Sequence, residues 1–350
     1  MDGDVQRVGR AVRTRFAGTA FELSVALGGE ARRLQALMRD GGFDVAHYHA
    51  IWTPFLPMQA FMAAAGASVA TVHDTPPDTS VGAIARKVLP HVSRAVLPLF
   101  DRVITVSAAP RACLRAGPGQ GISIIPPCTD LRRFAAATGR PRAEDEPVSL
   151  LFLGRLEPRK GCSLLLEAYR RLCAEGLNVR LVIVGAGAEE AALRQTVEQH
   201  GLPQVVFEGR APDEAAPQYY ADCDIFCAPA PYGESFGIVI AEAMAAGRPV
   251  VAAANPGYST LLKGEAAQGL ARAGDAEAFY RALRRLVVDP ARRRSLGAWG
   301  RAAATQYDCR TLAPRLVGLY REAILAHEVR GRQRRPLGGL VVQSDEAMPL

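Results

Sequence analysis

The sequence predicts an α/β protein of two domains, each built on a parallel β-sheet wrapped by helices. From about residue 148 onward, short apolar runs alternate with segments of helical period. A looser version of the same alternation fills the first part of the chain. The 350 residues, 49% of them hydrophobic and 22% charged, are enough to build two cores of ordinary domain size.

The second half supplies the clearer strands, which are short and nearly all apolar. Strands of this composition are expected when helices cover both faces of a parallel sheet. The strand candidates are VSLLFLG, VRLVIVG, QVVFEG, DIFCAP and PVVAAA. Helical patterns such as CSLLLEAYRRLCAEG and AEEAALRQTVEQHG separate them. We place a Rossmann-like domain at 148–310 on this alternation.

The first half repeats the pattern with DVAHYH, SVATVH, RVITVS and ISIIPP as strand candidates, which indicates a second Rossmann-like domain. Two such domains would face each other across a cleft. The remaining parts follow from composition and period. We expect an N-terminal domain at 1–137, a polar linker at 138–147, a closing helix at 311–329 and a basic, poorly ordered tail at 330–350.

Composition excludes few function classes. The N-terminus lacks the apolar core of a signal peptide and no later run suits a transmembrane helix, so a cytoplasmic location is expected. Seven scattered cysteines fit neither a disulfide framework nor a paired zinc motif. The formal net charge of +7 favours an anionic partner without deciding between a lipid surface, a phosphorylated substrate and nucleic acid. We assign no nucleic acid.

The segment APAPYGESFGIVIAEAMAAGRPVV is the most informative. A buried strand runs into the turn APYGES, after which a helix is expected from Phe236 to Ala246. The free backbone N–H groups at such a helix start can bind phosphate or sugar hydroxyls. These groups belong to Ser235, Phe236, Gly237 and Ile238.

Two carboxylates flank this helix start. Glu234 precedes the helix and Glu242 lies further along it, and carboxylates accept hydrogen bonds from hydroxyls such as those of a hexose and a ribose. The alternative is that both are ordinary helix charges. The apolar helix around Glu242 favours the ligand-binding interpretation.

A second segment, LLFLGRLEPRKGCSLLLEAY, places Arg155, Arg159 and Lys160 in a strand-to-helix loop. In an open α/β sheet, ligands bind at the edge where such loops emerge. Cations there can neutralise a diphosphate leaving group. A solvated basic loop is the alternative, and Arg159 is the residue we expect to be only a surface charge.

The segment LVIVGAGAEEAA raises the alternative of an NAD-dependent dehydrogenase. Gly185 and Gly187 fit its glycine fingerprint, but Glu190 stands where the third glycine belongs. A loop beside the base of a nucleotide-sugar needs no third glycine. Gly185 and Gly187 are therefore candidate nucleotide contacts.

Histidines and a D-x-D sequence are weighed as metal ligands and rejected. His47 and His49 share one face of a strand without an evident third ligand, so a polar strand end is preferred. The sequence Asp222-Cys223-Asp224 leads directly into a buried strand, so at least one of its aspartates is interpreted as a strand-start or capping residue. We assign no metal.

The motifs GRLEPRKG, VIVGAGAEEAAL, ADCDIFCAP and GESFGIVIAEAMAAGRPVVA, in this order, resemble the family-4 retaining glycosyltransferases of GT-B fold. The EPRKG and GESFGIV motifs are most similar to those of bacterial phosphatidylinositol mannosyltransferase-like enzymes. The resemblance covers roughly residues 45 to 330. The resemblance implies that Arg155 and Lys160 hold the donor diphosphate and that Glu242 binds the ribose. It also implies that the transferred hexose contacts Glu234 and the backbone of Phe236, Gly237 and Ile238. His73, at the end of SVATVH, is implied as a further contact to the hexose. The alternative for His73 is a structural histidine at the end of its strand.

The same resemblance implies the remaining features of the reaction. The acceptor attacks the sugar from the face that the phosphate leaves, and the departing phosphate oxygen takes the acceptor proton. No cofactor is expected beside a UDP- or GDP-sugar donor. Glu234 as a nucleophile stays open. The acceptor is a lipid, a polysaccharide or a small molecule, and an incomplete N-terminal domain is expected. A non-catalytic nucleotide-sugar-binding protein is the main alternative.

One segment suits contact with the inner face of a membrane. The stretch VGAIARKVLPHVSRAVLPLF sets Arg86, Lys87 and Arg94 among apolar residues. Pro90 and Pro98 weaken it as a single amphipathic helix. A packed helix with a basic rim is an equal alternative.

Overall fold

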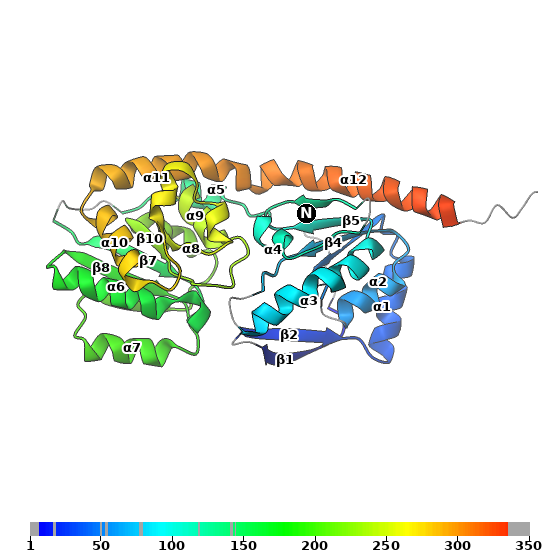
Figure 1. Ribbon diagram of the computed structural model, residues 1–350, viewed down its shortest axis with the longest axis horizontal. Coiled ribbons are helices and arrows are strands. Elements are labelled where there is room, and N and C mark those ends of the chain that lie inside the picture. Colours follow the sequence, from blue (N-terminus) through cyan, green and yellow to red (C-terminus); the bar gives the residue numbers. More distant parts are fainter. Residues whose placement is uncertain are drawn as a thin grey trace, which may run out of the picture.

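Two α/β domains lie side by side, and two helices near the end of the chain, α11 (Pro290–Ala304) and α12 (Cys309–Arg334), follow one another along the same side of both domains (Figure 1). The computed structural model describes residues 7–16, 19–49, 51–52, 55–76, 80–117, 120–140, 143 and 145–334. Each domain has its own parallel sheet. The predicted two-domain GT-B architecture is therefore confirmed.

The C-terminal domain contains a parallel sheet of six strands in the order β12-β11-β10-β7-β8-β9. Its strands are β7 (Val148–Leu153), β8 (Val179–Val184), β9 (Val205–Gly209), β10 (Ile225–Ala228), β11 (Val250–Ala253) and β12 (Leu270–Ala271). Successive residues face opposite sides, so Leu150 and Ile225 join one core whereas Leu151 and Phe226 join the other. This is why the strands are mostly apolar.

Helices cover both faces of that sheet. They are α6 (Cys162–Ala174), α7 (Glu190–Gln199), α8 (Ala216–Asp222), α9 (Ile238–Ala245), α10 (Ala276–Val287) and α11 (Pro290–Ala304). Short 3-10 helices η3 (Tyr258–Thr260), η4 (Gly264–Gly269) and η5 (Thr305–Tyr307) complete the connections.

The N-terminal domain contains a parallel sheet of four strands in the order β3-β4-β5-β6. These strands are β3 (Val45–His49), β4 (Ala67–Val72), β5 (Arg102–Thr105) and β6 (Ile122–Ile124). Its helices are α1 (Gly29–Asp40), α2 (Leu56–Ala63), α3 (Ser80–Val96), η1 (Leu97–Leu99) and α4 (Ala108–Ala112). An antiparallel hairpin of β1 (Arg10–Phe16) and β2 (Thr19–Val25) precedes them and was not predicted.

Helix α3 continues through Pro90, so the expectation that this proline weakens the helix was wrong. The hydroxyl of Ser93 donates to the Pro90 carbonyl at 3.1 Å and accepts from the Arg115 amide at 2.9 Å. These contacts tie the turn around the proline to the rest of the domain. The helix gives way to η1 only where Pro98 follows.

Two segments connect the domains and pair with each other where they cross. Thr129 in the outgoing segment forms a parallel bridge with Asp308 in the returning one. Helix α5 (Arg132–Ala136) already belongs to the packing of the C-terminal domain, because Phe134 lies in its core beside Tyr220. The domain limits proposed from the sequence remain a prediction.

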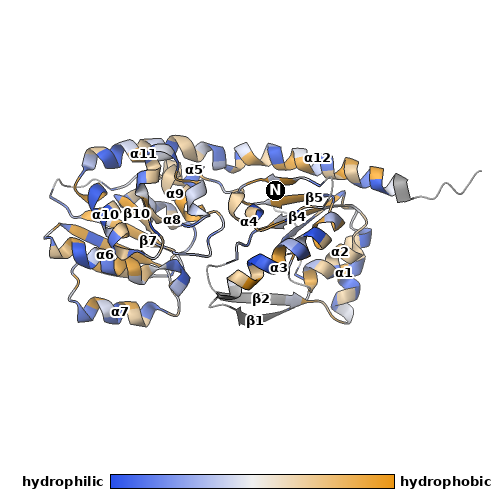
Figure 2. Cartoon of the chain, in the orientation of Figure 1, coloured by the Kyte–Doolittle hydropathy of each residue, from blue (hydrophilic) through white to orange (hydrophobic). Residues whose placement is uncertain are grey.

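The closing helix α12 (Cys309–Arg334) returns to cover the N-terminal sheet. Leu319 and Ala323 pack against Val69 and Ile104. Figure 2 shows apolar residues along β4 and β5 and hydrophilic residues recurring along α12. Among the described helices, none is long and apolar enough to cross a membrane.

Helix α12 continues five residues past residue 329, where the sequence analysis ends the closing helix. The helix reaches Arg334, because Arg330 pairs with the buried carboxylate of Asp101 and donates to the Pro98 carbonyl at 3.2 Å. The rest of the predicted tail, 335–350, lies outside the described residues.

Candidate functional site

The loop between β7 and α6 brings three cations to the carboxyl edge of the C-terminal sheet. A 3-10 helix, η2 (Pro158–Lys160), ends at Gly161, whose φ is +70°. A Cβ on Gly161 would lie 2.5 Å from the carbonyl oxygen of Pro229, so only glycine fits. Packing against the neighbouring loop therefore fixes the conformation. The cations of this loop are Arg155, Arg159 and Lys160.

The turn between β10 and α9 lies beside that loop and differs from its predicted form. The helix begins at Ile238 rather than at Phe236, because Gly237 adopts a left-handed conformation with φ +101°. A Cβ on Gly237 would lie 2.6 Å from Cδ1 of Tyr258. Ser235 and Phe236 therefore belong to the turn, and the free N–H groups of the first helical turn begin at Ile238.

The two loops meet in a cluster of charges. Lys160 Nζ lies 2.6 Å from Glu234 Oε1, and Arg159 Nη1 lies 3.3 Å from the same oxygen. Glu157 holds both arginines, with 2.9 Å to Arg155 Nη1 and 3.1 Å to Arg159 Nε. Because Glu234 is only 9% exposed, its carboxylate is held in place by two cations from the neighbouring loop.

Arg159 is not the free surface charge that the sequence suggested. Its side chain is 16% exposed, whereas that of Arg155 is 48% exposed. Arg159 spans two carboxylates, and this bridging could not be seen from the loop sequence alone. The prediction that Arg159 is only a surface charge was therefore wrong.

Glu242 lies on α9 with its carboxylate largely buried. Tyr220 donates a hydrogen bond of 2.8 Å to Glu242 Oε2. Burial raises the pKa of the Glu242 carboxyl, and the Tyr220 hydrogen bond opposes that rise. A buried carboxylate with one tyrosine partner has acceptor capacity left for a ligand hydroxyl.

The glycines after β8 fit against the cation loop. A Cβ on Gly185 would lie 1.8 Å from the Gly154 carbonyl oxygen, and one on Gly187 would lie 2.2 Å from that of Leu156. Both glycines are therefore required for loop packing, whatever they contact in a complex. Their position beside Gly154 puts this loop at the same sheet edge as Arg155.

The N-terminal domain touches the turn before α9 directly. Thr75 Oγ1 lies 2.9 Å from Ser235 Oγ, and Ser107 Oγ donates to the Ser235 carbonyl. Sequence reasoning named Ser235 but missed both N-terminal partners. The available signal was that Thr75 and Ser107 closely follow the ends of β4 and β5, where parallel strands direct side chains to one edge.

His73 lies two residues before Thr75 and pairs with another histidine. Its Nε2 lies 2.6 Å from Nδ1 of His49, and the two rings stack with centroids 4.9 Å apart. His47 is bonded instead to Tyr320 and Thr71, each at 2.7 Å. The preferred interpretation of His47 as a polar strand residue fits these contacts, but His49 gains a partner that the sequence did not reveal.

The D-x-D sequence lies at the opposite, amino edge of the C-terminal sheet. Asp224 accepts the backbone N–H of Ser149 at 2.7 Å, and Asp222 accepts that of Arg140 at 2.9 Å. Asp224 lies directly before β10 and bonds to Ser149 of β7, which fits the strand-start role predicted for at least one of these aspartates. The D-x-D sequence is far from the cluster around Glu234, which lies at the carboxyl edge.

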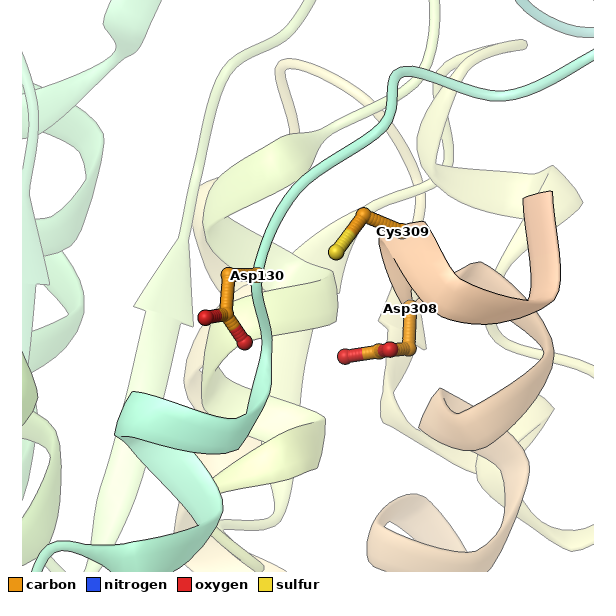
Figure 3. A group of neighbouring side chains, drawn as sticks. All are labelled: Asp130, Asp308 and Cys309. Atoms are coloured by element: carbon orange, nitrogen blue, oxygen red, sulfur yellow. The ribbon is translucent and has the colours of Figure 1, made fainter. Parts of the chain in front are cut away.

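Among the described residues, one group places three metal-ligating atoms within 4.8 Å of one another (Figure 3). Asp130 and Cys309 lie there beside Asp308, at the crossing of the two connecting segments. Arg132 pairs with Asp130 at 2.9 Å, and Arg310 pairs with Asp308 at 2.9 Å. The carboxylates thus already have cationic partners.

Comparison with known proteins identifies the family. Residues 137–303 match the family described as glycosyl transferases group 1, and residues 3–133 match the one described as glycosyltransferase family 4. These two matches correspond to the two domains of the structure. The glycine pair after β8 therefore lies in a glycosyltransferase domain, which removes the basis of the dehydrogenase alternative.

Relatives that are named as glycosyltransferases match most of the chain. A phosphatidyl-myo-inositol mannosyltransferase of Mycobacterium leprae is 32% identical over 324 residues, covering 90% of this chain and 83% of the relative. The corresponding enzyme of Mycolicibacterium smegmatis is 31% identical, covering 89% and 79%. A D-inositol 3-phosphate glycosyltransferase of Stackebrandtia nassauensis is 33% identical over a shorter stretch, covering 63% and 52%.

Solved structures share the fold. Sucrose-phosphate synthase of Thermosynechococcus elongatus superimposes with a TM-score of 0.69 at 24% identity, covering 85% of this chain and 77% of that one. HepE of Anabaena, solved with UDP, gives 0.68 at 20% identity, covering 83% and 81%. The chain therefore belongs to the family-4 retaining glycosyltransferases of GT-B fold.

Proposed function

We propose that the donor diphosphate binds between Lys160 and Arg155 and that its hexose lies against Glu234 and the start of α9. The contact of 2.6 Å between Lys160 Nζ and Glu234 Oε1 carries this proposal. It sets a cation for phosphate and an acceptor for sugar hydroxyls side by side at the ligand-binding edge of the sheet. The N–H groups of Gly237 and Ile238, beside Phe236, add donors to the same place.

The proposed reaction keeps the anomeric configuration of the hexose. The bond from the anomeric carbon to the phosphate oxygen breaks while the acceptor oxygen bonds to the same face. The departing phosphate oxygen takes the acceptor proton, and Lys160 and Arg155 stabilise the growing negative charge. His73 lies in the N-terminal domain, two residues before Thr75, which contacts Ser235, and is the proposed contact to the hexose. Gly185 and Gly187 are proposed to lie near the nucleotide base.

The proposal leaves UDP and GDP as candidate nucleotides, and HepE, whose fold is shared, was solved with UDP. Because Lys160 and Arg155 supply positive charge at the proposed diphosphate position, we propose that no metal is needed. Calorimetry with UDP and GDP, followed by transfer assays with the matching hexose donor with and without EDTA, tests both points. Binding of one nucleotide and EDTA-resistant transfer are expected.

Two results would revise the proposal in different ways. Nucleotide binding without hydrolysis or transfer from any UDP- or GDP-hexose would favour a non-catalytic sugar-nucleotide-binding protein. Failure of both nucleotides to bind would reject the donor site itself.

Glu242 predicts a pH dependence of donor binding. Its raised pKa means that the carboxyl takes up a proton at a higher pH than an exposed glutamate, and the protonated group loses acceptor capacity for the ribose. As pH falls through this pKa, the donor KM should rise by about 10-fold. Initial rates measured across the pH range would show the rise.

Two variants check the cause of that pH dependence. Glu242→Gln should have a high donor KM at every pH. Tyr220→Phe removes a hydrogen bond that lowers the Glu242 pKa, so its transition should move to higher pH. An unchanged pH profile in both variants would exclude Glu242 as the titrating group.

For the acceptor we propose a polyol head group of a lipid in an anionic membrane. Relatives are named for transfer to phosphatidyl-myo-inositol. On α3, Ile84, Val88 and Val92 recur at intervals of four and are 65%, 51% and 40% exposed. The helix carries Lys87 and no acidic residue. An apolar stripe with basic neighbours favours a negatively charged lipid surface.

Vesicle binding tests this membrane proposal. The full chain should bind phosphatidylglycerol vesicles more tightly than phosphatidylcholine vesicles, and the double variant Ile84→Ser, Val88→Ser should bind about 10-fold more weakly. Leu325→Ser with Val329→Ser is the matched control, because both side chains are exposed on α12, 62% and 53%. Equal losses in both double variants would show that α3 has no special part in binding.

A further inference from the structure

Three histidines of the N-terminal domain, His47, His49 and His73, contact one another in sequence order. The last of them, His73, is the residue proposed to contact the sugar. Tyr320 of α12 bonds to His47 Nδ1, and the His47 ring lies 4.5 Å from that of His49. His49 Nδ1 in turn lies 2.6 Å from His73 Nε2. His73 is therefore held by His49, the last residue of the neighbouring strand β3.

A neutral imidazole has one ring nitrogen that donates and one that accepts. A contact of 2.6 Å between two neutral imidazole nitrogens needs one proton between them, so the tautomers of the two rings are coupled. His73 is the Nε2–H tautomer when it donates to His49 and the Nδ1–H tautomer when it accepts. With Nε2 engaged by His49, Nδ1 is the nitrogen left to meet a ligand. In each arrangement of the pair, Nδ1 of His73 therefore has one hydrogen-bonding character toward a ligand, an acceptor in the first and a donor in the second.

We propose that His49 is a positioning residue that orients the His73 ring and fixes its tautomer through the Nδ1 to Nε2 hydrogen bond. The proposal rests on the proposed function, in which His73 meets the transferred hexose. His49 itself reaches no substrate in this arrangement. Its effect on the reaction is to hold the His73 ring in the orientation in which His73 contacts a hydroxyl of the hexose.

The surroundings keep the pair uncharged. Burial lowers the pKa of His47 to about 4, and it lowers the pKa values of His49 and His73 as well. Neighbouring imidazoles lower those of His47 and His49 further, while Asp74 is the nearby charge that raises that of His73. The remaining ionisable neighbour is Tyr320, at His47. Neutral rings, which are the ones that have tautomers, therefore predominate at neutral pH.

The experiment uses the full chain labelled with ¹⁵N-histidine, in which six histidines give a resolvable set of ring-nitrogen signals. In the unsubstituted chain, His73 should show the shifts of a single tautomer. His49→Leu should give averaged shifts for His73. It should also lower kcat by about 10- to 100-fold with little change in the donor KM, because a misoriented group costs more in the transition state than in binding.

Two variants separate positioning from general damage. His49→Asn places an amide close to the position of Nδ1 and should restore the single tautomer and most of kcat. His200→Asn, at an exposed position, should change neither. A single His73 tautomer together with an unchanged kcat in His49→Leu would overturn the proposal.

The two readouts also separate this inference from the proposed function. If the unsubstituted chain transfers no sugar, the function fails, while the tautomer measurement still decides whether His49 orients His73. If the chain is active and the His73 signals do not respond to His49→Leu, only the positioning role is lost.

Discussion

Replacing Lys160 with alanine is expected to lower kcat/KM for the sugar donor by about 100- to 1,000-fold. The ammonium group is the cation closest to Glu234, at 2.6 Å, and its side chain is only 18% exposed. At this position it can neutralise charge that develops on the leaving diphosphate in a partly desolvated environment. Steady-state kinetics with the preferred donor, beside calorimetry with the nucleotide, measures the loss.

Arg159→Ala provides the matched comparison. Arg159 contacts Glu157 and Glu234, so its removal should loosen the carboxylate and lower activity by about 10-fold, less than the loss of Lys160. Arg281→Ala, whose side chain is 71% exposed, should have no effect. Equal losses in the Lys160 and Arg159 variants would contradict distinct roles for these two cations.

The strands and helices of the C-terminal domain were predictable because each one is marked by a pattern within a short stretch of the sequence. A parallel strand covered on both faces is expected to be mostly apolar, and β10 and β11 appear in the sequence as uninterrupted apolar runs. The loops that follow such strands emerge at one edge. The sequence therefore placed Lys160 and Glu234 near each other without any structural information.

The features that escaped prediction depend on contacts between distant segments. Thr75 meets Ser235 across 160 residues of chain, and no local pattern marks such a pair. His49 and His73 lie on neighbouring strands, but their pairing depends on the register of β3 against β4, in which His49 lies opposite Thr71. Two-residue periodicity predicts a shared face and leaves the register open.

The start of α9 shows a third kind of limit. The sequence Gly-Glu-Ser-Phe-Gly predicts a turn followed by a helix, but the first helical residue depends on the left-handed conformation of Gly237. That conformation is required by Tyr258, which comes from a later segment and fills the space a side chain would need. Element limits are set by such tertiary packing as often as by local preference.

Glu234→Ala should also abolish most of the transfer, with a loss in kcat of about 100-fold or more. The carboxylate accepts from Lys160 and Arg159, so its removal takes away a sugar contact and leaves the two cations without their shared partner. Glu234→Gln keeps the volume and one acceptor and should retain more activity. Comparing kcat and the donor KM of both variants with their unfolding temperatures separates lost chemistry from lost stability.

The alanine variant also decides whether Glu234 is a nucleophile. If its carboxylate attacked the anomeric carbon, azide added to Glu234→Ala could take its place and release the nucleoside diphosphate, giving a glycosyl azide of inverted configuration. In the proposed front-face reaction the carboxylate never bonds to the sugar, so azide should restore nothing. Lys160 and Arg159 both bond to Glu234 Oε1, so in the proposed reaction the carboxylate serves as a hydrogen-bond acceptor held in place by two cations. Formation of the inverted azide would assign Glu234 the nucleophilic role and replace the front-face mechanism with a double displacement.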